Sequence, residues 1–176
     1  MGTKNIVFLV VVVLIATGLG GFFIVQYGSV NRLTEIRSIP ELTFTDYSGK
    51  AVALSQFLGK PMVVNAWASW CPFCVEELSD FISLQEEYKD KIAVIAVNRA
   101  EPPAIAKNYT DHRGLTEKLV FLLDSPDSFY QAIGGFSMPE TIFADKDGKI
   151  VFHKRGPMNL EEMRRRIEEL FLWNIH

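Results

Sequence analysis

The sequence predicts an α/β domain in which helices cover both faces of a mixed β-sheet, preceded by one apolar N-terminal segment. Strand-like apolar runs alternate with helix-like amphipathic runs after that segment, an order typical of layered α/β proteins. The turn-forming run Asp145–Lys149 joins the last two predicted strands as a hairpin, which adds an antiparallel pair to the sheet.

The apolar segment, Ile6–Val25, contains twenty residues and no charge. At ~1.5 Å of rise per residue, a helix of this length spans roughly 30 Å, the thickness of the hydrocarbon layer of a membrane. We therefore expect a transmembrane helix or uncleaved signal anchor, with a signal peptide cleaved near Ala16–Gly18 as the alternative. The expected organisation is a short flank (1–5), the anchor (6–25), a tether (26–37) and one domain of ordinary size (38–176).

Charge excludes one class of partner but does not orient the anchor. The formal net charge is −3 and no basic run is present, which argues against a nucleic-acid partner. Lys4 precedes the apolar segment, while Arg32 and Arg37 follow it, so the positive-inside rule gives no clear side for the domain.

Cys71 and Cys74 are the only cysteines in the chain, and they form a Cys-x-x-Cys motif. The apolar run Met62–Trp67 predicts a strand before the motif, and Val75–Tyr88 predicts an amphipathic helix after it. A helix N-terminus offers unpaired N–H groups and a positive dipole end, which lower the pKa of a cysteine from ~8.5 to roughly 3.5–7.5. Pro72 suits the first helical turn, where no N–H is needed. The pattern favours a redox-active dithiol.

Two other interpretations of the cysteine motif are weaker. A structural disulfide across so short a loop removes little entropy from the unfolded chain and would stabilise the fold little. A zinc or copper site lacks a second cysteine pair, and the three histidines, His112, His153 and His176, are scattered. We therefore expect no metal and no small-molecule cofactor, because the protein dithiol itself carries two electrons.

The remaining elements follow from apolar runs and helix-capping signals. We expect further strands at 92–97, 119–123, 140–144 and 150–154, and further helices at 101–111, 127–133 and 159–172. Ser125-Pro126 is expected to cap the second of these helices. Asn159 and Glu162 form a capping-box pattern at the start of the third. His153 is expected on the surface of its strand.

The stretch from Val64 to Cys74 resembles the active-site segment of thioredoxin-fold proteins, and is most similar to their membrane-tethered TlpA, ResA and CcmG (DsbE) branch. A second motif, Ser137–Thr141, lies where that fold carries its cis-proline. The resemblance covers residues 38–173 and implies a thioredoxin-like fold with a cis peptide at Met138-Pro139. In that arrangement the backbone of Met138 pairs with an extended substrate segment. Asn65 replaces the buried aspartate of cytoplasmic thioredoxins, and we expect it to be a hydrogen-bonded amide.

The resemblance also implies the residues of the site. Cys71, near-exposed, exchanges with a partner disulfide, and the more buried Cys74 resolves the mixed disulfide. Glu77 matches a glutamate that this branch often carries, which can accept a proton from Cys74 if burial raises its pKa. The match is partial, since the branch often has a basic residue and a proline where this chain has Val75 and Ser79. The expected docking rim for the partner consists of Trp70, Pro72, Phe73, Met138 and Pro139.

These features predict a membrane-anchored thiol–disulfide oxidoreductase whose domain faces away from the cytoplasm, as the resemblance implies. Its expected partners are protein disulfide or dithiol substrates and a membrane electron donor. The resemblance to the cytochrome c maturation branch favours a reductase, with a disulfide oxidase or isomerase as the alternative, because the motif alone does not fix the direction of electron flow.

Two further alternatives are a peroxiredoxin-like peroxidase and a copper metallochaperone. Peroxiredoxins usually carry Thr or Ser, and Pro, where this chain has Ala68 and Val64. Related copper carriers use a wider cysteine spacing together with a histidine.

Overall fold

The computed structural model describes residues 38–173. The predicted flank, anchor (6–25) and tether lie outside the described residues, so the membrane helix stays a prediction. Within residues 38–173, no helix combines the length and the apolar composition that crossing a membrane requires.

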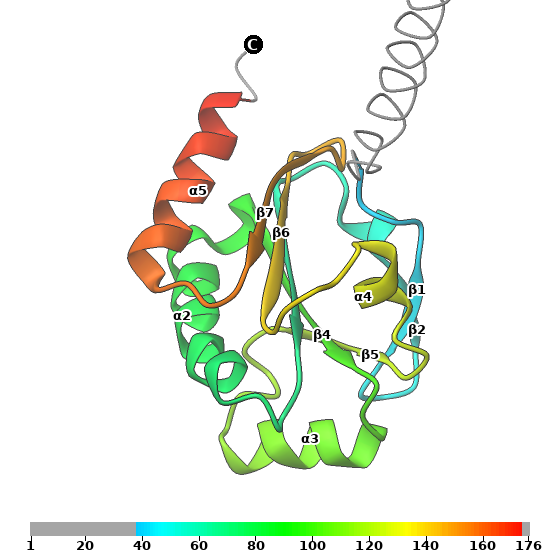
Figure 1. The fold of residues 1–176 in the computed structure, drawn as a ribbon. Coiled ribbons are helices and arrows are strands. Elements are labelled where there is room, and N and C mark those ends of the chain that lie inside the picture. The colour runs from blue at the N-terminus through cyan, green and yellow to red at the C-terminus, as the bar shows by residue number, and fades with distance from the viewer. Residues whose placement is uncertain (1–37, 174–176) are drawn as a thin grey trace, which may run out of the picture. The chain divides into compact units, whose positions relative to one another are not determined.

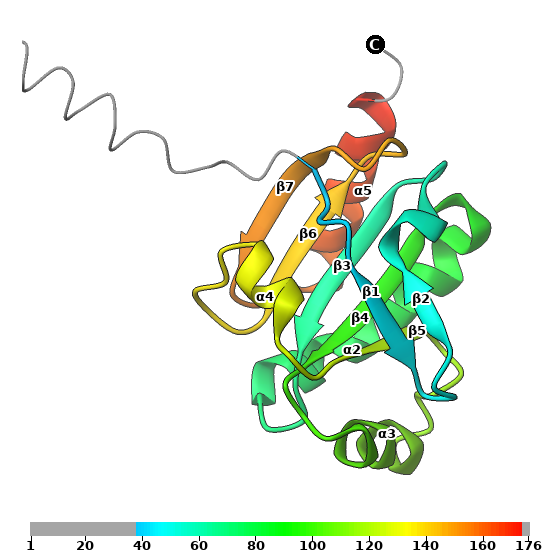
Figure 2. The same ribbon diagram turned by 90° about the vertical axis from the view of Figure 1, so that its right-hand side faces the viewer.

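One mixed sheet of seven strands forms the centre of the described domain (Figures 1 and 2). Its strands are β1 (Thr43–Asp46), β2 (Ala51–Ala53), β3 (Met62–Trp67), β4 (Ala93–Arg99), β5 (Val120–Asp124), β6 (Glu140–Ala144) and β7 (Ile150–Arg155). They lie in the order β2-β1-β5-β4-β3-β6-β7. The three middle strands β5, β4 and β3 run parallel, and each strand outside them runs antiparallel to its inner neighbour. The predicted mixed sheet is confirmed, and the short β1–β2 hairpin adds to the strands expected.

Helices cover both faces of this sheet, as the sequence predicts. The described helices are α2 (Pro72–Tyr88), α3 (Pro103–His112), α4 (Ser128–Ala132) and α5 (Leu160–Trp173), with short 3₁₀ segments η1 (Leu54–Phe57) and η2 (Lys89–Lys91). In Figure 1, α2 and α5 lie side by side against one face, α4 lies against the other, and α3 lies at one end of the sheet.

Alternating side chains of β3 divide the core between the two faces. Val64 belongs to the cluster that includes Phe129 of α4. Val63 belongs to the opposite cluster, which includes Phe81 of α2. Every residue of β3 is buried, as expected for a parallel strand covered on both faces. Trp67, at the end of β3, belongs to a third cluster, which also contains both cysteines.

The predicted cap of α4 was wrong. Ser125 does not cap this helix; the N-cap is Asp127, in a left-handed conformation with φ of 60° and without a side-chain cap. The carboxylate of the buried Asp124 instead accepts hydrogen bonds from the N–H groups of Ser128 at 2.9 Å and Phe129 at 2.7 Å. The last residue of β5 therefore satisfies the first-turn donors of α4.

The predicted capping box of α5 forms only in part. Oδ1 of Asn159 accepts a hydrogen bond of 2.9 Å from the N–H of Glu162, as expected. The carboxylate of Glu162 turns instead to Lys154, whose Nζ donates to both of its oxygens at 2.8 and 3.0 Å. This contact ties α5 to β7.

Candidate active site

The two cysteines form a disulfide at the start of α2. Cys71 is the N-cap of the helix and Pro72 is its first residue, where the sequence pattern placed them. The sulfur atoms are 2.02 Å apart and the Cα atoms 5.3 Å apart. The N–H of Cys74 donates a hydrogen bond of 3.2 Å to Sγ of Cys71. In a reduced pair, this donor and the positive end of the helix favour a thiolate at Cys71.

Cys71 is less exposed than the sequence interpretation expected. Its relative exposure is 3% and that of Cys74 is 0%, because both pack in the cluster that includes Trp67. The expectation of a near-exposed Cys71 was therefore wrong, whereas the deeper burial of Cys74 is confirmed. The side chains beside the cysteines point to solvent, since Trp70 is 62% and Phe73 57% exposed.

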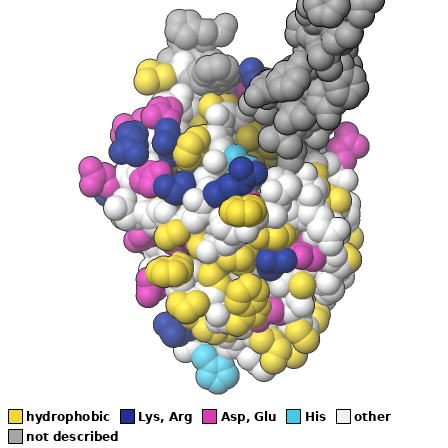
Figure 3. Space-filling model, in the orientation of Figure 1, with side chains coloured by type: hydrophobic (Ala, Val, Ile, Leu, Met, Phe, Trp, Pro, Cys, Tyr) yellow, Lys and Arg dark blue, Asp and Glu magenta, His cyan; other side chains and the backbone are white. Residues whose placement is uncertain are grey.

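The register of the sheet brings the second sequence motif to the disulfide. β6 runs antiparallel to β3 with Glu140 opposite Ala66, so the residues just before β6 lie beside the end of β3 that leads to Cys71. The peptide bond between Met138 and Pro139 is cis, as the resemblance implied. Met138 packs against the cluster that contains the disulfide. Figure 3 shows the surface in the orientation of Figure 1. Hydrophobic side chains gather on the lower half of the surface in this view, while charged side chains gather higher up, over α5.

Glu77 lies one turn into α2, on the side of Cys74, because residues three apart share a helix face. The residue is buried, and burial raises the pKa of its carboxyl to about 8. The N–H of Met158 donates a hydrogen bond to Oε1, which lowers the pKa but does not offset the effect of burial. Oε2 is also buried and has no hydrogen-bond partner among the described residues. A carboxyl whose pKa lies near the ~8.5 of a thiol can exchange a proton with it at little cost in free energy.

Asn65 is fully buried in β3. Its Nδ2 donates a hydrogen bond of 3.0 Å to Oγ1 of Thr141 on β6, which links the two strands that carry the two motifs. Its Oδ1 is buried without a hydrogen-bond partner in the part of the chain that the structure describes. The amide nitrogen of Asn65 is thus hydrogen-bonded as expected, whereas its amide oxygen is not.

Glu101 is a buried carboxylate that the sequence interpretation did not connect with the site. It accepts hydrogen bonds from the N–H and Oγ of Ser69, at 2.8 and 2.5 Å, and from Nδ2 of Asn98 at 2.6 Å. Ser69 lies two residues before Cys71, so Glu101 fixes the loop between β3 and the disulfide. Its place directly before two prolines indicated only a helix start.

Glu140 is a second carboxylate that was missed. It is fully buried, and Oε1 accepts the N–H groups of Phe136 at 2.5 Å and Ser137 at 2.8 Å. Its Oε2 lies 2.7 Å from Nε2 of His153, which is therefore a partly buried partner rather than the surface residue expected. Glu140 thus holds the loop that ends in the cis peptide. A single Pro-Glu-Thr run carries no signal that the carboxylate is buried.

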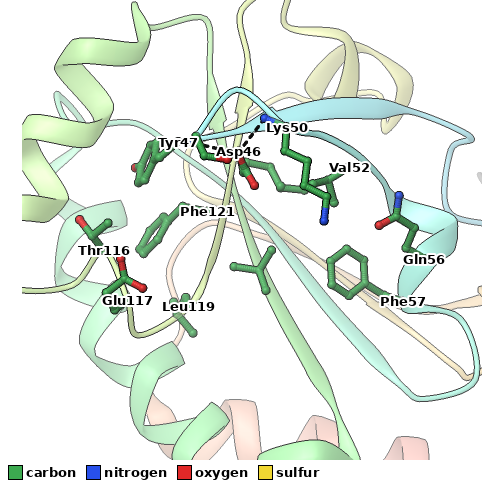
Figure 4. A pocket seen from close by; sticks show the side chains of 13 residues that line it. Asp46, Tyr47, Lys50, Val52, Gln56, Phe57, Thr116, Glu117, Leu119 and Phe121 are labelled. Atoms are coloured by element: carbon green, nitrogen blue, oxygen red, sulfur yellow. Dashed lines mark hydrogen bonds between the residues drawn. The ribbon is translucent and has the colours of Figure 1, made fainter.

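A pocket of about 460 Å³ lies between the β1–β2 turn and the start of β5 (Figure 4). Tyr47 and Phe121 stack at its edge with ring centroids 5.7 Å apart, and Phe121 packs edge-on against Trp67 at 5.7 Å. Burial raises the pKa of Tyr47 to about 12. None of the predicted site residues lines this pocket.

Metal ligands do not gather around the cysteine pair. Within residues 38–173, no group of three or more His, Cys, Asp or Glu side chains is placed to hold a metal ion. The chemistry that the site can support with its own residues is the exchange of one disulfide for another.

A sequence model of the Redoxin family matches residues 36–170, which include nearly all of the described domain. The chain belongs to the Redoxin family. Within this family it is similar to thiol-disulfide oxidoreductases named ResA. The ResA of Bacillus cereus is 28% identical over 173 residues, covering 97% of this chain and 99% of the relative. The ResA of Geobacillus kaustophilus is 30% identical over 132 residues, covering 74% of this chain and 75% of the relative.

Solved structures share the fold of this Redoxin domain. A putative thiol:disulfide interchange protein DsbE from Chlorobium tepidum has a TM-score of 0.71 at 22% identity, covering 76% of this chain and 95% of its own. The exposed lipoprotein thioredoxin Etrx1 from Streptococcus pneumoniae has a TM-score of 0.64 at 27% identity, covering 74% of this chain and 100% of its own. The family, the relatives and the closed cysteine pair make the chain a thiol–disulfide oxidoreductase of the TlpA/ResA/DsbE type.

Proposed function

We propose that this Redoxin-family enzyme reduces disulfides of proteins outside the cytoplasm through Cys71 and Cys74. The observation that carries the proposal is the disulfide at the N-terminus of α2, with the buried Glu77 one turn behind it and the cis peptide before Pro139 beside it. Reduction of a partner needs a stabilised thiolate, a second thiol in reach and a proton acceptor. These three groups lie within the first two turns of one helix.

In the first step, the thiolate of Cys71 attacks one sulfur of the partner disulfide. A bond forms between Sγ of Cys71 and that sulfur, while the partner S–S bond breaks. The second partner sulfur leaves as a thiolate and takes a proton from solvent. The N–H of Cys74, which lies 3.2 Å from Sγ of Cys71, and the helix dipole stabilise the attacking thiolate.

In the second step, Cys74 attacks Sγ of Cys71 and releases the partner. The ionised form of Glu77 accepts the thiol proton of Cys74 and delivers it to the departing partner sulfur, so the partner leaves with both cysteines reduced. Two electrons pass from the enzyme dithiol to the partner, and the Cys71–Cys74 bond closes. The pKa of about 8 suits Glu77 to this transfer, because donor and acceptor then differ little in basicity.

The partner is proposed to bind as an extended segment beside the backbone of Met138. Main-chain pairing of this kind gives affinity that depends little on the partner's sequence. Met138 already packs against the disulfide cluster, which supports this location. The proposed rim around the reacting sulfur consists of Trp70, Pro72, Phe73, Met138 and Pro139.

We further propose that residues 6–25 anchor the enzyme and that the domain, 38–176, lies outside the cytoplasm. A membrane protein with a dithiol would return the enzyme disulfide to the reduced state. The resemblance of the segment from Val64 to Cys74 to the TlpA, ResA and CcmG branch supports a role in cytochrome c maturation, with apocytochrome disulfides as the proposed substrates. An oxidation-dependent reporter fused to the C-terminus should be active on a full-length chain. Cytoplasmic reporter behaviour, or a mature form that begins near Gly20, would contradict one part or the other.

The direction of electron flow is tested by the reduction potential of the Cys71–Cys74 pair against a thiol buffer. A reductase should have a potential near that of thioredoxin, roughly −270 mV, and thiol trapping in cells should find the pair reduced. A potential near ~−120 mV, with both cysteines oxidised in cells, would assign the enzyme to disulfide oxidation instead.

A further inference from the structure

Phe136 is the most exposed of the large hydrophobic side chains among the described residues, at 85%. It lies in the loop between α4 and β6. Met138, two residues further on, packs against the cluster that contains the disulfide. Two residues of chain span at most roughly 7 Å, so the Cα of Phe136 lies within that distance of the Cα of Met138. An apolar ring of this size beside a reactive site marks a surface that a partner covers.

The loop that carries Phe136 is held in one conformation. The N–H groups of Phe136 and Ser137 donate to the carboxylate of Glu140 at 2.5 and 2.8 Å, and the Oη of Tyr130 donates to the carbonyl of Ser137 at 2.9 Å. The N–H of Gly135 donates to the carbonyl of Tyr130 at 2.7 Å. A Cβ at Gly135 would come within 2.5 Å of the Tyr130 ring, so the chain passes directly against that ring.

Glu140, which holds this loop, is itself fixed from β7. Its oxygens lie 2.7 Å from Nε2 of His153 and 3.8 Å from Nε of Arg155, and the residue is fully buried. Phe136 is therefore an exposed aromatic side chain on a preorganised loop. Such a side chain loses little conformational entropy when a partner covers it, and this favours binding.

We infer that Phe136 is a substrate-recognition residue, which contacts an apolar side chain near the reacting cysteine of the protein substrate. This inference rests on the proposed exchange with protein disulfides. Cys71 is only 3% exposed, so a partner must cover the surface around it to bring a sulfur atom to Sγ. Met138 packs against the disulfide cluster and Phe136 is two residues away in the chain, so a partner segment that passes over Met138 comes within reach of the exposed Phe136 ring. The substrate class is thus an extended protein segment with an apolar residue within a few positions of its cysteine.

The test uses short peptides that carry one cysteine, blocked as a mixed disulfide with thionitrobenzoate. In a serine- and glycine-rich background, a single leucine is moved from position to position on both sides of the cysteine. Each peptide is mixed with the reduced enzyme, and the released thionitrobenzoate gives the rate constant. The enzyme dithiol supplies both electrons, so one turnover suffices. At one position, leucine should raise the wild-type rate constant about tenfold, the scale of one interface anchor.

Phe136→Ala should abolish this gain from leucine. Leu172→Ala is the matched control, because Leu172 is an exposed apolar residue at the far end of α5 (Figure 1), and this variant should keep the gain. Tyr130→Phe removes the hydroxyl that holds the Ser137 carbonyl and should shrink the gain. An undiminished gain in Tyr130→Phe would overturn the role of the fixed loop.

The outcomes separate the inference from the proposed function. If the reduced wild type releases no thionitrobenzoate from any peptide, the proposed exchange fails and the inference with it. If the wild type reacts but no leucine position is preferred, or Phe136→Ala keeps the preference, the inference fails while the exchange stands. If sedimentation shows that the wild type self-associates and that Phe136→Ala does not, while this variant keeps the preference, Phe136 is a contact between copies of this chain and the inference fails.

Discussion

Replacing Glu77 by glutamine tests the buried carboxyl behind the disulfide. In the folded oxidised protein, burial raises the pKa of Glu77 to about 8, whereas an unfolded chain leaves a glutamate near ~4.3. Between these two pH values the folded state holds a proton that the unfolded state has lost. The stability that Glu77 contributes is therefore full below the unfolded pKa and is lost as the pH rises through the folded pKa.

The size of this effect follows from the shift in pKa. Each pH unit within the window lowers the free energy of unfolding by about 1.4 kcal/mol, so the wild type should lose up to about 5 kcal/mol relative to Glu77→Gln between pH ~4 and pH ~8. Solvent relaxation around the carboxylate reduces the measured value below this limit. Glutamine keeps an oxygen that can accept the N–H of Met158, so the comparison isolates the charge.

Urea unfolding of the two oxidised proteins over this pH range gives the required free energies. Glu76→Gln is the control, because Glu76 is the neighbouring residue on α2 but is exposed, and this variant should follow the slope of the wild type. Parallel stability curves for the wild type and Glu77→Gln would refute the burial of a titrating carboxyl.

In the reduced protein, Glu77→Gln should slow the reduction of a model disulfide and change the pH profile of its rate. An unchanged profile would make Glu77 a bystander in catalysis.

Three further predictions concern the reactive thiol and two buried carboxylates. A limiting amount of alkylating agent at neutral pH should label Cys71 before Cys74 in the reduced protein, because Cys71 has the helix N–H donor; dominant labelling of Cys74 in peptide mapping would reverse their roles. Glu101→Gln should lower the free energy of unfolding by about 1–3 kcal/mol, since an amide cannot accept all three hydrogen bonds; an unchanged urea midpoint would contradict this. Asp124→Ala should cost at least about 1 kcal/mol, because two N–H groups of α4 lose their acceptor, and Asp124→Asn should recover part of the loss in the same assay.

The sequence by itself located the cysteine pair and the elements that hold it. β3 has the bounds Met62–Trp67 that the apolar pattern predicts, and β6 has the predicted bounds Glu140–Ala144. A strand buried on both faces is apolar along most of its length, so its ends are visible locally. The proline after Cys71 is likewise a local signal for a helix start, and α2 begins there. These local motifs also sufficed to place the chain in its fold.

Only the tertiary structure decided which side chains in and around the site are exposed to solvent. Glu76 and Glu77 are the same residue type one position apart, yet Glu76 is exposed and Glu77 is buried against the backbone of Met158, eighty-one positions away. Cys71 is buried and Phe136 is exposed, although neither fact follows from the neighbouring letters. Solvent access is set by segments that are distant in sequence and that the sheet brings together. The pKa of a carboxyl, the reach of a thiol and the surface offered to a partner all depend on that access.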